Sequence, residues 1–389
     1  MRVVLAPDSF KGSIGAEGAA AAIAEGWRDA RPGDDLVCLP LADGGEGTLQ
    51  VLAATHPAAR WHPAEVTGPD GRPVASRWLE FRDGTGYIEL AQASGLPLMA
   101  TLDPLGAQTL GTGQLIADAI DAGARRIVVA LGGSASTDGG TGALAALGAH
   151  FLDSAGRDLP GGGGALRDLA SADLTGLRPP PPGGVTCLTD VRVPLLGPGG
   201  AAAVFGPQKG AGKAQVAILE AGLTRLALVL GGDPDAQGAG AAGGTSYGLA
   251  AAWGAGLTPG AVEICRAVGL DDQLSRADLV LTGEGCYDAT SGDGKITGAV
   301  LAAAARAGVP AVLVGGVIAA DPPPGVAAAV ALAGLAGGAA AAMASPERWL
   351  RAAGRMLAID LGRGGDGAAG GAGRGRAGRG REGREGRAN

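Results

Sequence analysis

The sequence predicts an α/β protein of two domains, with the first domain built from both ends of the chain. The chain has 389 residues, more than a single hydrophobic core usually organises. Short apolar segments, each followed by a glycine-rich loop and an alanine-rich helical segment, recur along it, as they do in parallel sheets. The last apolar segments resemble the first two, so we expect them to complete the first sheet around an inserted domain.

Two strand–loop–helix units open the chain. Residues 2–6 predict a buried strand and residues 14–30 an alanine-rich helix, for which Ser13 is the expected N-cap. Residues 35–40 predict a second strand, and a glycine-rich loop at residues 42–48 leads from it into a short helix. Repeated units of this kind favour parallel strands joined by helical crossovers.

The middle of the chain has a different pattern. Short alternating strands separated by turns occupy residues 61–90, so we place a domain boundary near residue 65. A strand at residues 126–131 restores the first pattern, and two late strands at residues 279–282 and 311–315 resemble the first two. The predicted division is one domain from residues 1–65 and 271–361, an inserted α/β domain at residues 66–270, and a tail at residues 362–389.

The composition excludes several classes of protein. Hydrophobic residues make up 46% of the chain and charged residues 18%, which is enough for a large core. The formal net charge is −7, and the Gly/Arg-rich tail carries seven arginines against three acidic residues. The rest of the chain is therefore acidic, and nucleic acid is not expected as a partner. We expect the tail to be a disordered extension rather than an RNA- or membrane-binding arm.

Cysteine and histidine usage narrows the chemistry further. The four cysteines lie far apart and form no CxxC pair, which predicts neither a disulfide framework nor a zinc site and favours the cytoplasm. With only three histidines, a Ser-His-Asp triad is poorly supported. No stretch is long and apolar enough to predict a membrane span.

Polar residues gather at four glycine-rich exits from predicted strands. Turns of this kind expose backbone N–H groups that bind anions. Phosphoryl transfer requires cations near the phosphate, carboxylates for Mg²⁺ and a base near the attacking hydroxyl. No Walker A sequence is present, so a nucleotide would bind through another geometry. The four exits contain Asp8, Ser9 and Lys11; Asp43 and Glu46; Ser134 and Asp138; and Glu284, Asp288 and Lys295.

Six segments resemble, in the same order, those of type I glycerate kinases. They are APDSFKGS at residues 6–13, PLADGGEGT at 40–48, LGGSASTDGG at 131–140, FGPQKGA at 205–211, GAGAAGG at 238–244 and TGEG at 282–285. The resemblance spans residues 2–316 and weakens toward residue 361. Several of these segments are seven or more residues long, so chance similarity is not credible.

The resemblance implies a fold, an activity and its substrates. It implies a flavodoxin-like, Rossmann-like parallel-sheet domain from both chain ends, an inserted second α/β domain, and an active site in the cleft between them. The implied reaction is ATP-dependent phosphorylation of D-glycerate to phosphoglycerate and ADP, with Mg²⁺ as cofactor and 2-phosphoglycerate as the favoured product. Partners would be glycerate and ATP, with no nucleic acid and no membrane. The oligomeric state stays open, a homodimer included.

The resemblance also points to the polar residues that line such a cleft, to which we assign roles. A catalytic set would orient or deprotonate the hydroxyl, a second set would bind substrate and phosphate, and carboxylates would hold the metal. The catalytic set is Asp8, Lys11 and Asp190; the binding set is Ser9, Gly44, Gly45, Ser134, Asp138, Lys209 and Lys295; the metal set is Asp43, Glu46, Glu284 and Asp288.

Two positions depart from the family pattern. Val193 stands where the family usually has Asn, and Cys286 stands where it usually has Arg. Loss of one charge-assisted hydrogen bond costs about 1.5–3 kcal/mol, so substrate choice or rate could differ. Two alternatives therefore remain beside glycerate kinase: a kinase for another small hydroxy acid, and a non-catalytic ligand-binding descendant.

Overall fold

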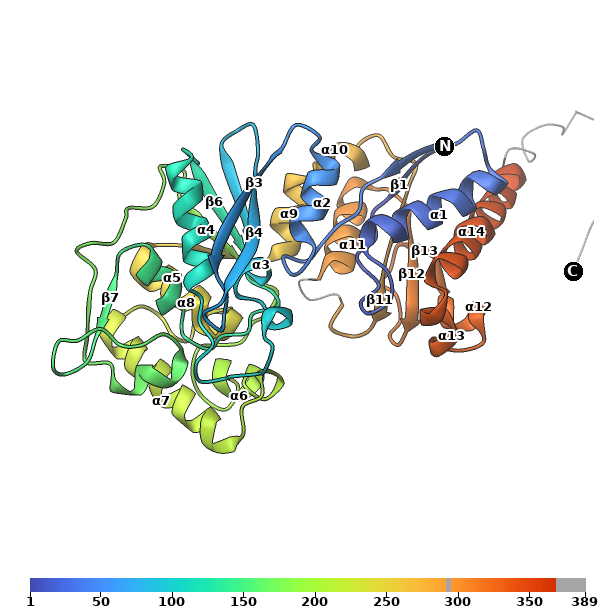
Figure 1. Cartoon of the computed structure of the whole chain (residues 1–389). Coiled ribbons are helices and arrows are strands. Elements are labelled where there is room, and N and C mark those ends of the chain that lie inside the picture. The colour runs from blue at the N-terminus through green and yellow to red at the C-terminus, as the bar shows by residue number, and fades with distance from the viewer. Residues whose placement is uncertain (292–294, 369–389) are drawn as a thin grey trace, which may run out of the picture.

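The computed structural model describes residues 1–291 and 295–368, with side chains described up to residue 361. Two lobes lie side by side, each built around its own sheet (Figure 1). The N-terminal strand and the last helix lie in the same lobe, at the opposite end from the second sheet. The predicted mixed α/β fold, with one lobe formed from both ends of the chain, is confirmed.

The first lobe contains a parallel sheet in which the N-terminal strand is central. Its strand pairs are all parallel. Most residues of these strands are apolar, as expected of a sheet covered on both faces. Across the sheet the order is β13 (Val326–Ala331), β12 (Ala311–Ile318), β11 (Leu279–Tyr287), β1 (Arg2–Leu5) and β2 (Asp35–Cys38).

Helices cover both faces of this sheet. On one face α1 (Ala16–Ala30) and α14 (Pro346–Ala368) pack over a cluster of buried side chains that includes Leu5. The two helices approach closely because Gly26 lies at their crossing, where a Cβ would come within 1.9 Å of a backbone oxygen of α14. Val4, one residue before Leu5, belongs to a second cluster with the helices of the other face, as strand alternation requires.

The second cluster joins the two lobes. It contains α2 (Thr48–Thr55), α9 (Gly260–Ala267), α10 (Leu270–Leu274) and α11 (Ile296–Ala307), together with strand residues of both sheets. Val280 comes from the first sheet, and Val128 and Leu188 come from the second. The lobes therefore share a continuous apolar core behind the surfaces that face each other.

The second lobe is built on a mixed sheet of six strands. Its first three strands pair antiparallel, and the strands from β5 onward pair parallel. A separate antiparallel pair joins β7 (His150–Leu152) to β8 (Ser171–Asp173). Across the main sheet the order is β10 (Gly256–Thr258), β9 (Val185–Leu188), β6 (Arg126–Ala130), β5 (Thr85–Glu89), β4 (Pro73–Glu80) and β3 (Arg60–Thr67).

Further helices complete both lobes. In the second lobe they are α3 (Ala91–Ser94), α4 (Leu110–Asp121), α5 (Thr141–Ala146), α6 (Ala201–Phe205), α7 (Lys213–Leu230) and α8 (Ala241–Trp253); in the first they are α12 (Leu332–Ala336) and α13 (Ala339–Ala344). None of the helices in the described part of the chain combines the length and apolar character needed to cross a membrane.

Several local features differ from the sequence-based expectation. The N-cap of α1 is Gly15, not Ser13, because the Ser13 hydroxyl donates to the Phe10 carbonyl, 2.7 Å away, inside a tight turn. The strand expected at residues 279–282 continues to Tyr287, since β12 pairs with it along its length. α14 ends at Ala368, inside the range predicted as a tail, and residues 369–389 of that disordered-tail prediction lie outside the described residues.

The strands also show where the predicted domain boundaries fall. Residue 65 lies inside β3, which begins at Arg60 and belongs to the second sheet. α9, which precedes the predicted boundary at residue 270, packs against α10 and α11, and α11 packs against β11 and β12 of the first sheet. We propose that the two sheets divide before Arg60 and after Thr258, because a strand cannot be split between two cores.

Candidate active site

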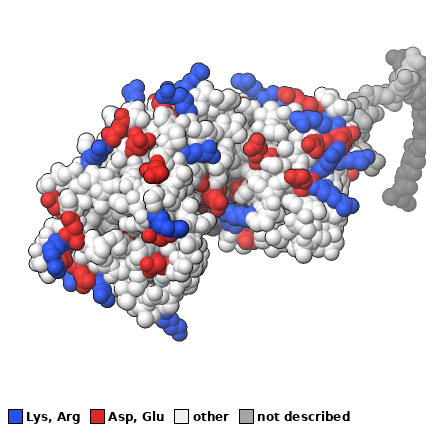
Figure 2. Space-filling model, viewed as in Figure 1, with Lys and Arg blue, Asp and Glu red and all other residues white. Residues whose placement is uncertain are grey.

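A cleft of about 1380 Å³ lies between the lobes. Figure 2 shows charged side chains of both signs at the junction of the two lobes. The lining includes Asp8 after β1, Asp43 after β2, Ser134 after β6 and Asp190 after β9. Carboxyl ends of strands from both sheets therefore face one space, which is where α/β proteins bind their ligands.

The topological switch point of the first sheet also lies at this cleft. From β1 the chain moves outward to β2, whereas β11, β12 and β13 extend in the other direction. The switch therefore falls between β1 and β11, whose exits carry Asp8 and Glu284. A crevice outside the carboxyl ends of two such strands is the usual ligand site of an open parallel sheet.

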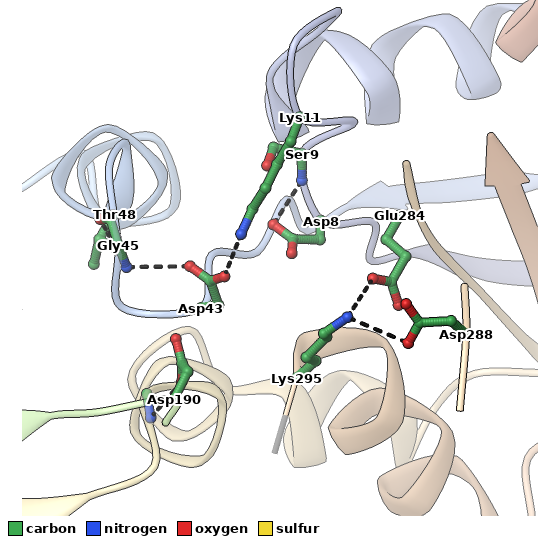
Figure 3. Close-up of polar contacts among 11 residues, drawn as sticks. Asp8, Ser9, Lys11, Asp43, Gly45, Thr48, Asp190, Glu284, Asp288 and Lys295 are labelled. Carbon is green, nitrogen blue, oxygen red and sulfur yellow. Dashed lines mark hydrogen bonds and ion pairs between the residues drawn. The ribbon is translucent and has the colours of Figure 1, made fainter. Parts of the chain in front are cut away.

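Asp43 connects two of the predicted site segments. Its Oδ2 lies 2.9 Å from Lys11 Nζ, and its Oδ1 accepts a hydrogen bond of 3.1 Å from Gly45 N (Figure 3). Burial works to lower the pKa of Lys11, but the charge and hydrogen bond of Asp43 raise it above its ordinary value. Lys11 therefore remains a cation at the cleft.

Glycines let the loops of the two lobes touch. A Cβ on Gly132 would lie 2.5 Å from Gly45 Cα. Gly44 has a φ of 89°, in the left-handed region that favours glycine. Any side chain at Gly132 would thus push the loop after β6 away from the loop after β2, and the cleft would change its shape.

Two buried aspartates have strongly raised pKa values. Burial, then the charge of Asp43, raises the pKa of Asp8 to about 7 and that of Asp190 to about 8. Asp8 Oδ1 accepts from Ser9 N at 2.6 Å, and Asp190 Oδ1 accepts from Gly260 N at 3.1 Å. Carboxylates with a pKa near neutrality can accept a proton from a substrate hydroxyl.

A lysine and two carboxylates meet at the exit of β11. Lys295 Nζ lies 3.7 Å from Glu284 Oε2 and 3.7 Å from Asp288 Oδ1. Glu284 is 7% exposed, and its Oε1 has no hydrogen-bond partner within the described residues. The hydroxyl and N–H of Thr290 bond Asp288 and lower the pKa of that carboxyl.

Lys209 is a buried lysine on the second lobe's side of the cleft. Its Nζ donates to Ser134 Oγ at 3.0 Å and to the carbonyl oxygen of Ser136. Burial lowers the pKa of Lys209 to about 7, while the charge of Asp138 opposes that change. Lys209 and the loop after β6 thus bring an amine and a hydroxyl together at the cleft.

Comparison with known proteins adds to this geometry. A sequence model of the glycerate kinase family matches residues 3–362. The chain belongs to the glycerate kinase family. It is 43% identical to a glycerate kinase of Bacillus subtilis (strain 168) and 40% identical to glycerate 2-kinase of Escherichia coli (strain K12); each alignment covers 82% of this chain and 86% of the relative.

A solved structure agrees with the family assignment. The crystal structure of a protein designated glycerate kinase 2, from Salmonella typhimurium LT2, matches with a TM-score of 0.81 and 38% identity, over 94% of this chain and 99% of that one. Membership of the glycerate kinase family confirms the predicted family and the predicted enzyme class, an ATP-dependent kinase.

Most predicted site residues line the cleft, Glu284 and Asp288 line a smaller cavity beside it, and Asp138 lies behind it. Asp138 is fully buried and does not line the cleft. Its carboxylate accepts hydrogen bonds from Thr109 N (2.9 Å), Thr109 Oγ1 (2.8 Å), Gly140 N (3.2 Å) and Gly142 N (3.3 Å). These bonds order the loop that carries Ser134. The residues that line the cleft are Asp8, Ser9, Lys11, Asp43, Gly44, Gly45, Glu46, Ser134, Asp190, Lys209 and Lys295.

The four predicted metal ligands are divided by their contacts. Asp43 is bonded to Lys11, whereas Glu284 and Asp288 share Lys295. Glu46 lines the larger cleft. Within residues 1–291 and 295–361, no three His, Cys, Asp or Glu side chains form a group that could hold a metal ion by themselves.

Glu89, at the end of β5, is a site-associated residue that sequence reasoning missed. It is 1% exposed, and its carboxylate accepts from Gly47 N at 3.1 Å and Leu49 N at 3.2 Å. The second sheet thereby caps α2 of the first lobe, next to the loop of Asp43. The available signal was a Glu inside the apolar segment Tyr-Ile-Glu-Leu.

The two departures from the family pattern occupy different environments. Cys286 is exposed and lines a second, smaller cavity beside the cleft. Val193 lines neither cavity, and its carbonyl accepts a hydrogen bond of 2.9 Å from Gly240 N. Of the two changes, the one at Cys286 is therefore in a position to contact a ligand.

Proposed function

We propose that the chain phosphorylates D-glycerate with ATP, giving 2-phosphoglycerate and ADP, in the cleft between the lobes. The observation that carries the proposal is the meeting of Asp190, from the second sheet, with the Lys11–Asp43 pair of the first. The relatives named above as glycerate kinase and glycerate 2-kinase support both the substrate and the position phosphorylated.

The cleft supplies the groups that phosphoryl transfer needs. A substrate hydroxyl attacks the γ-phosphorus, its proton passes to a carboxylate, and the bond to the leaving ADP oxygen breaks. Asp190 or Asp8 would take the proton, since both have a pKa near neutrality. Lys11 and Lys295 would offset phosphate charge. Lys209 and Ser134, on the opposite wall, suit the carboxylate of the acid.

The residues present also fit a Mg²⁺ ion that arrives with the nucleotide. Mg²⁺ is usually held by one or two carboxylates together with phosphate oxygens, rather than by a complete protein cage. Among the described residues Glu284 offers a buried oxygen without a partner, and Asp288 and Asp43 lie in the same cavity. These three carboxylates would hold the ion, which when bound offsets negative charge on the phosphates.

The test is ADP release from the purified chain with Mg-ATP, with and without D-glycerate. We expect glycerate-dependent release, and ³¹P and ¹³C NMR of the product to show phosphate on carbon 2. Asp190→Asn should lower kcat by roughly 10²–10⁴-fold if Asp190 is the base. The matched control is Asp168→Asn, an exposed aspartate outside both cavities, which should retain activity.

Other outcomes distinguish the alternatives. Turnover with another small hydroxy acid but not glycerate would favour the alternative acceptor, for which the exposed Cys286 is the motivating feature. Nucleotide binding by calorimetry without any ADP release would favour a non-catalytic descendant. Cytoplasmic location and a homodimer stay predictions.

A further inference from the structure

A second cavity opens beside the cleft, at the exits of β1, β11 and β12. Its volume is about 380 Å³, within the roughly 300–1,000 Å³ of small-molecule pockets. Asp8, Lys11, Asp43 and Lys295 line both this cavity and the larger cleft. A molecule in the smaller cavity would therefore reach the reacting groups from the side opposite Asp190.

The far wall of this smaller cavity is apolar. Leu332 of α12 and Ala342 of α13 are buried, and Met343 of α13 is 54% exposed at the cavity. Gly285 of β11 and Gly316 of β12 line it without side chains, so backbone forms part of its surface. An apolar wall of this kind favours a ligand that buries an apolar group, such as a planar ring, against it.

The near end carries the two lysines of the site. Lys11 follows β1, and Lys295 precedes α11. A ligand that contacts both the apolar wall and the two lysines must carry a planar, largely apolar group joined to an anionic group. The adenosine and phosphates of ATP have this form, whereas glycerate is small and polar throughout and would gain nothing from the wall of Met343.

We propose that the smaller cavity binds the adenosine portion of the nucleotide. Its phosphates extend past Lys11 and Lys295 into the larger cleft, where the acid lies beside Asp190, Ser134 and Lys209. This inference rests on the proposed function, because it assigns the two substrates of that reaction to two parts of one site.

The larger cleft offers a competing apolar slot. Leu96, Pro97 and Phe205 line it on the side of the second lobe. The two lysines shared with the smaller cavity, Lys11 and Lys295, come instead from the first lobe. If the adenine ring stacked on Phe205, it would occupy the side of the cleft that holds Asp190 and Lys209. Glycerate would then lack those partners.

Cys286 provides a chemical probe in the unmodified chain. It is exposed and lines the smaller cavity, whereas Cys38, also exposed, lies in β2 outside both cavities and serves as an internal control. The rate of alkylation by N-ethylmaleimide would be followed at each cysteine by peptide mass spectrometry. Saturating Mg-ADP should slow alkylation of Cys286 by on the order of tenfold and leave Cys38 unchanged, and D-glycerate should slow neither.

Kinetics of variants give a second, independent test. Met343→Glu should raise the KM for ATP by on the order of tenfold, about 1.4 kcal/mol, and leave the KM for D-glycerate nearly unchanged. The matched control is Leu228→Glu, on α7, which replaces an apolar side chain that is 77% exposed and outside both cavities. This control should change neither KM.

Three results would overturn the assignment. They are protection of Cys286 by D-glycerate without protection by Mg-ADP, no protection by either, and an ATP KM that rises in Phe205→Ala but not in Met343→Glu. Failure of the proposed function has a different signature, the absence of glycerate-dependent ADP release in the wild type. Protection of Cys286 by Mg-ADP would still report the nucleotide pocket in that case.

Discussion

Asp8 in the first lobe and Asp138 in the second are both buried carboxylates that follow a strand of a central sheet, but their partners differ. Four donors of the chain occupy the oxygens of Asp138. Asp8 accepts one backbone hydrogen bond and lies near the like charges of Asp43 and Glu284. A carboxylate whose oxygens are bonded within the chain orders structure, and one left open is available to a ligand or a proton.

The same contrast separates Glu89 from Glu284. Glu89 bonds two backbone N–H groups of the first lobe, whereas Glu284 keeps one buried oxygen without a partner among the described residues. Glu89 thus stabilises the start of α2, whereas Glu284 keeps an oxygen that could bind a cation.

The largest effect is expected at Asp8. Asp8→Asn should lower kcat by roughly 10²–10⁴-fold if this carboxyl orients or accepts the proton. It should keep or increase the free energy of unfolding near pH 8, because it removes a buried charge that the fold stabilises poorly. Steady-state kinetics and urea denaturation of the same preparation measure both quantities. If Asp8→Asn lost stability but kept its activity, Asp8 would have the structural role assigned to Asp138, and the contrast between the two residues would be wrong.

Asp138→Ala should show the opposite pattern. The change leaves buried hydrogen-bond donors of Thr109, Gly140 and Gly142 without an acceptor. Each donor that finds no new partner lowers the free energy of unfolding by about 1–3 kcal/mol. A total loss of about 3–5 kcal/mol in the free energy of unfolding follows. Denaturant titration measures it. Stability equal to the wild type would show that these bonds do not order the loop.

Glu89→Gln tests the contact between the lobes. A neutral amide accepts through one oxygen only, so one of the two N–H groups, of Gly47 or Leu49, loses its partner. We expect a loss of about 1–3 kcal/mol in the free energy of unfolding, together with a higher KM for the substrate that the Asp43 loop contacts. Glu65→Gln, an exposed change in β3, is the control and should be neutral.

The raised carboxyl pKa values predict how stability depends on pH. Asp8 and Asp190 have folded pKa values of about 7 and about 8, above their ordinary value of 3.8. Between those values the folded state binds more protons than the unfolded state, so these groups lower stability as the pH rises from about 4 to about 8. The double variant Asp8→Asn, Asp190→Asn should flatten this slope in thermal unfolding. An identical slope in wild type and variant would contradict it.

The smallest effect concerns backbone strain at the cleft. Ala242 has a φ of 51°, the single positive value at a non-glycine residue in the described part of the chain, and it lines the cleft. Ala242→Gly should increase stability by about 1 kcal/mol, since a left-handed alanine costs about 1–2 kcal/mol. Ala250→Gly in the regular part of α8 should instead lower stability by roughly 0.5–1 kcal/mol. A loss of stability in both variants would argue against strain at Ala242.

The sequence by itself determined the α/β class, the return of the chain to its first sheet, and the loops that carry Asp8, Asp43 and Glu284. These features have local signatures: apolar periodicity marks a buried strand, and glycines beside carboxylates mark its exit. The position of Asp138 behind the cleft and the cap made by Glu89 were decided only by tertiary structure. The Thr109 partner of Asp138 and the Gly47 partner of Glu89 lie 29 and 42 residues away in the chain. The first bond therefore exists only once the second lobe has folded, and the second only once the two lobes are assembled.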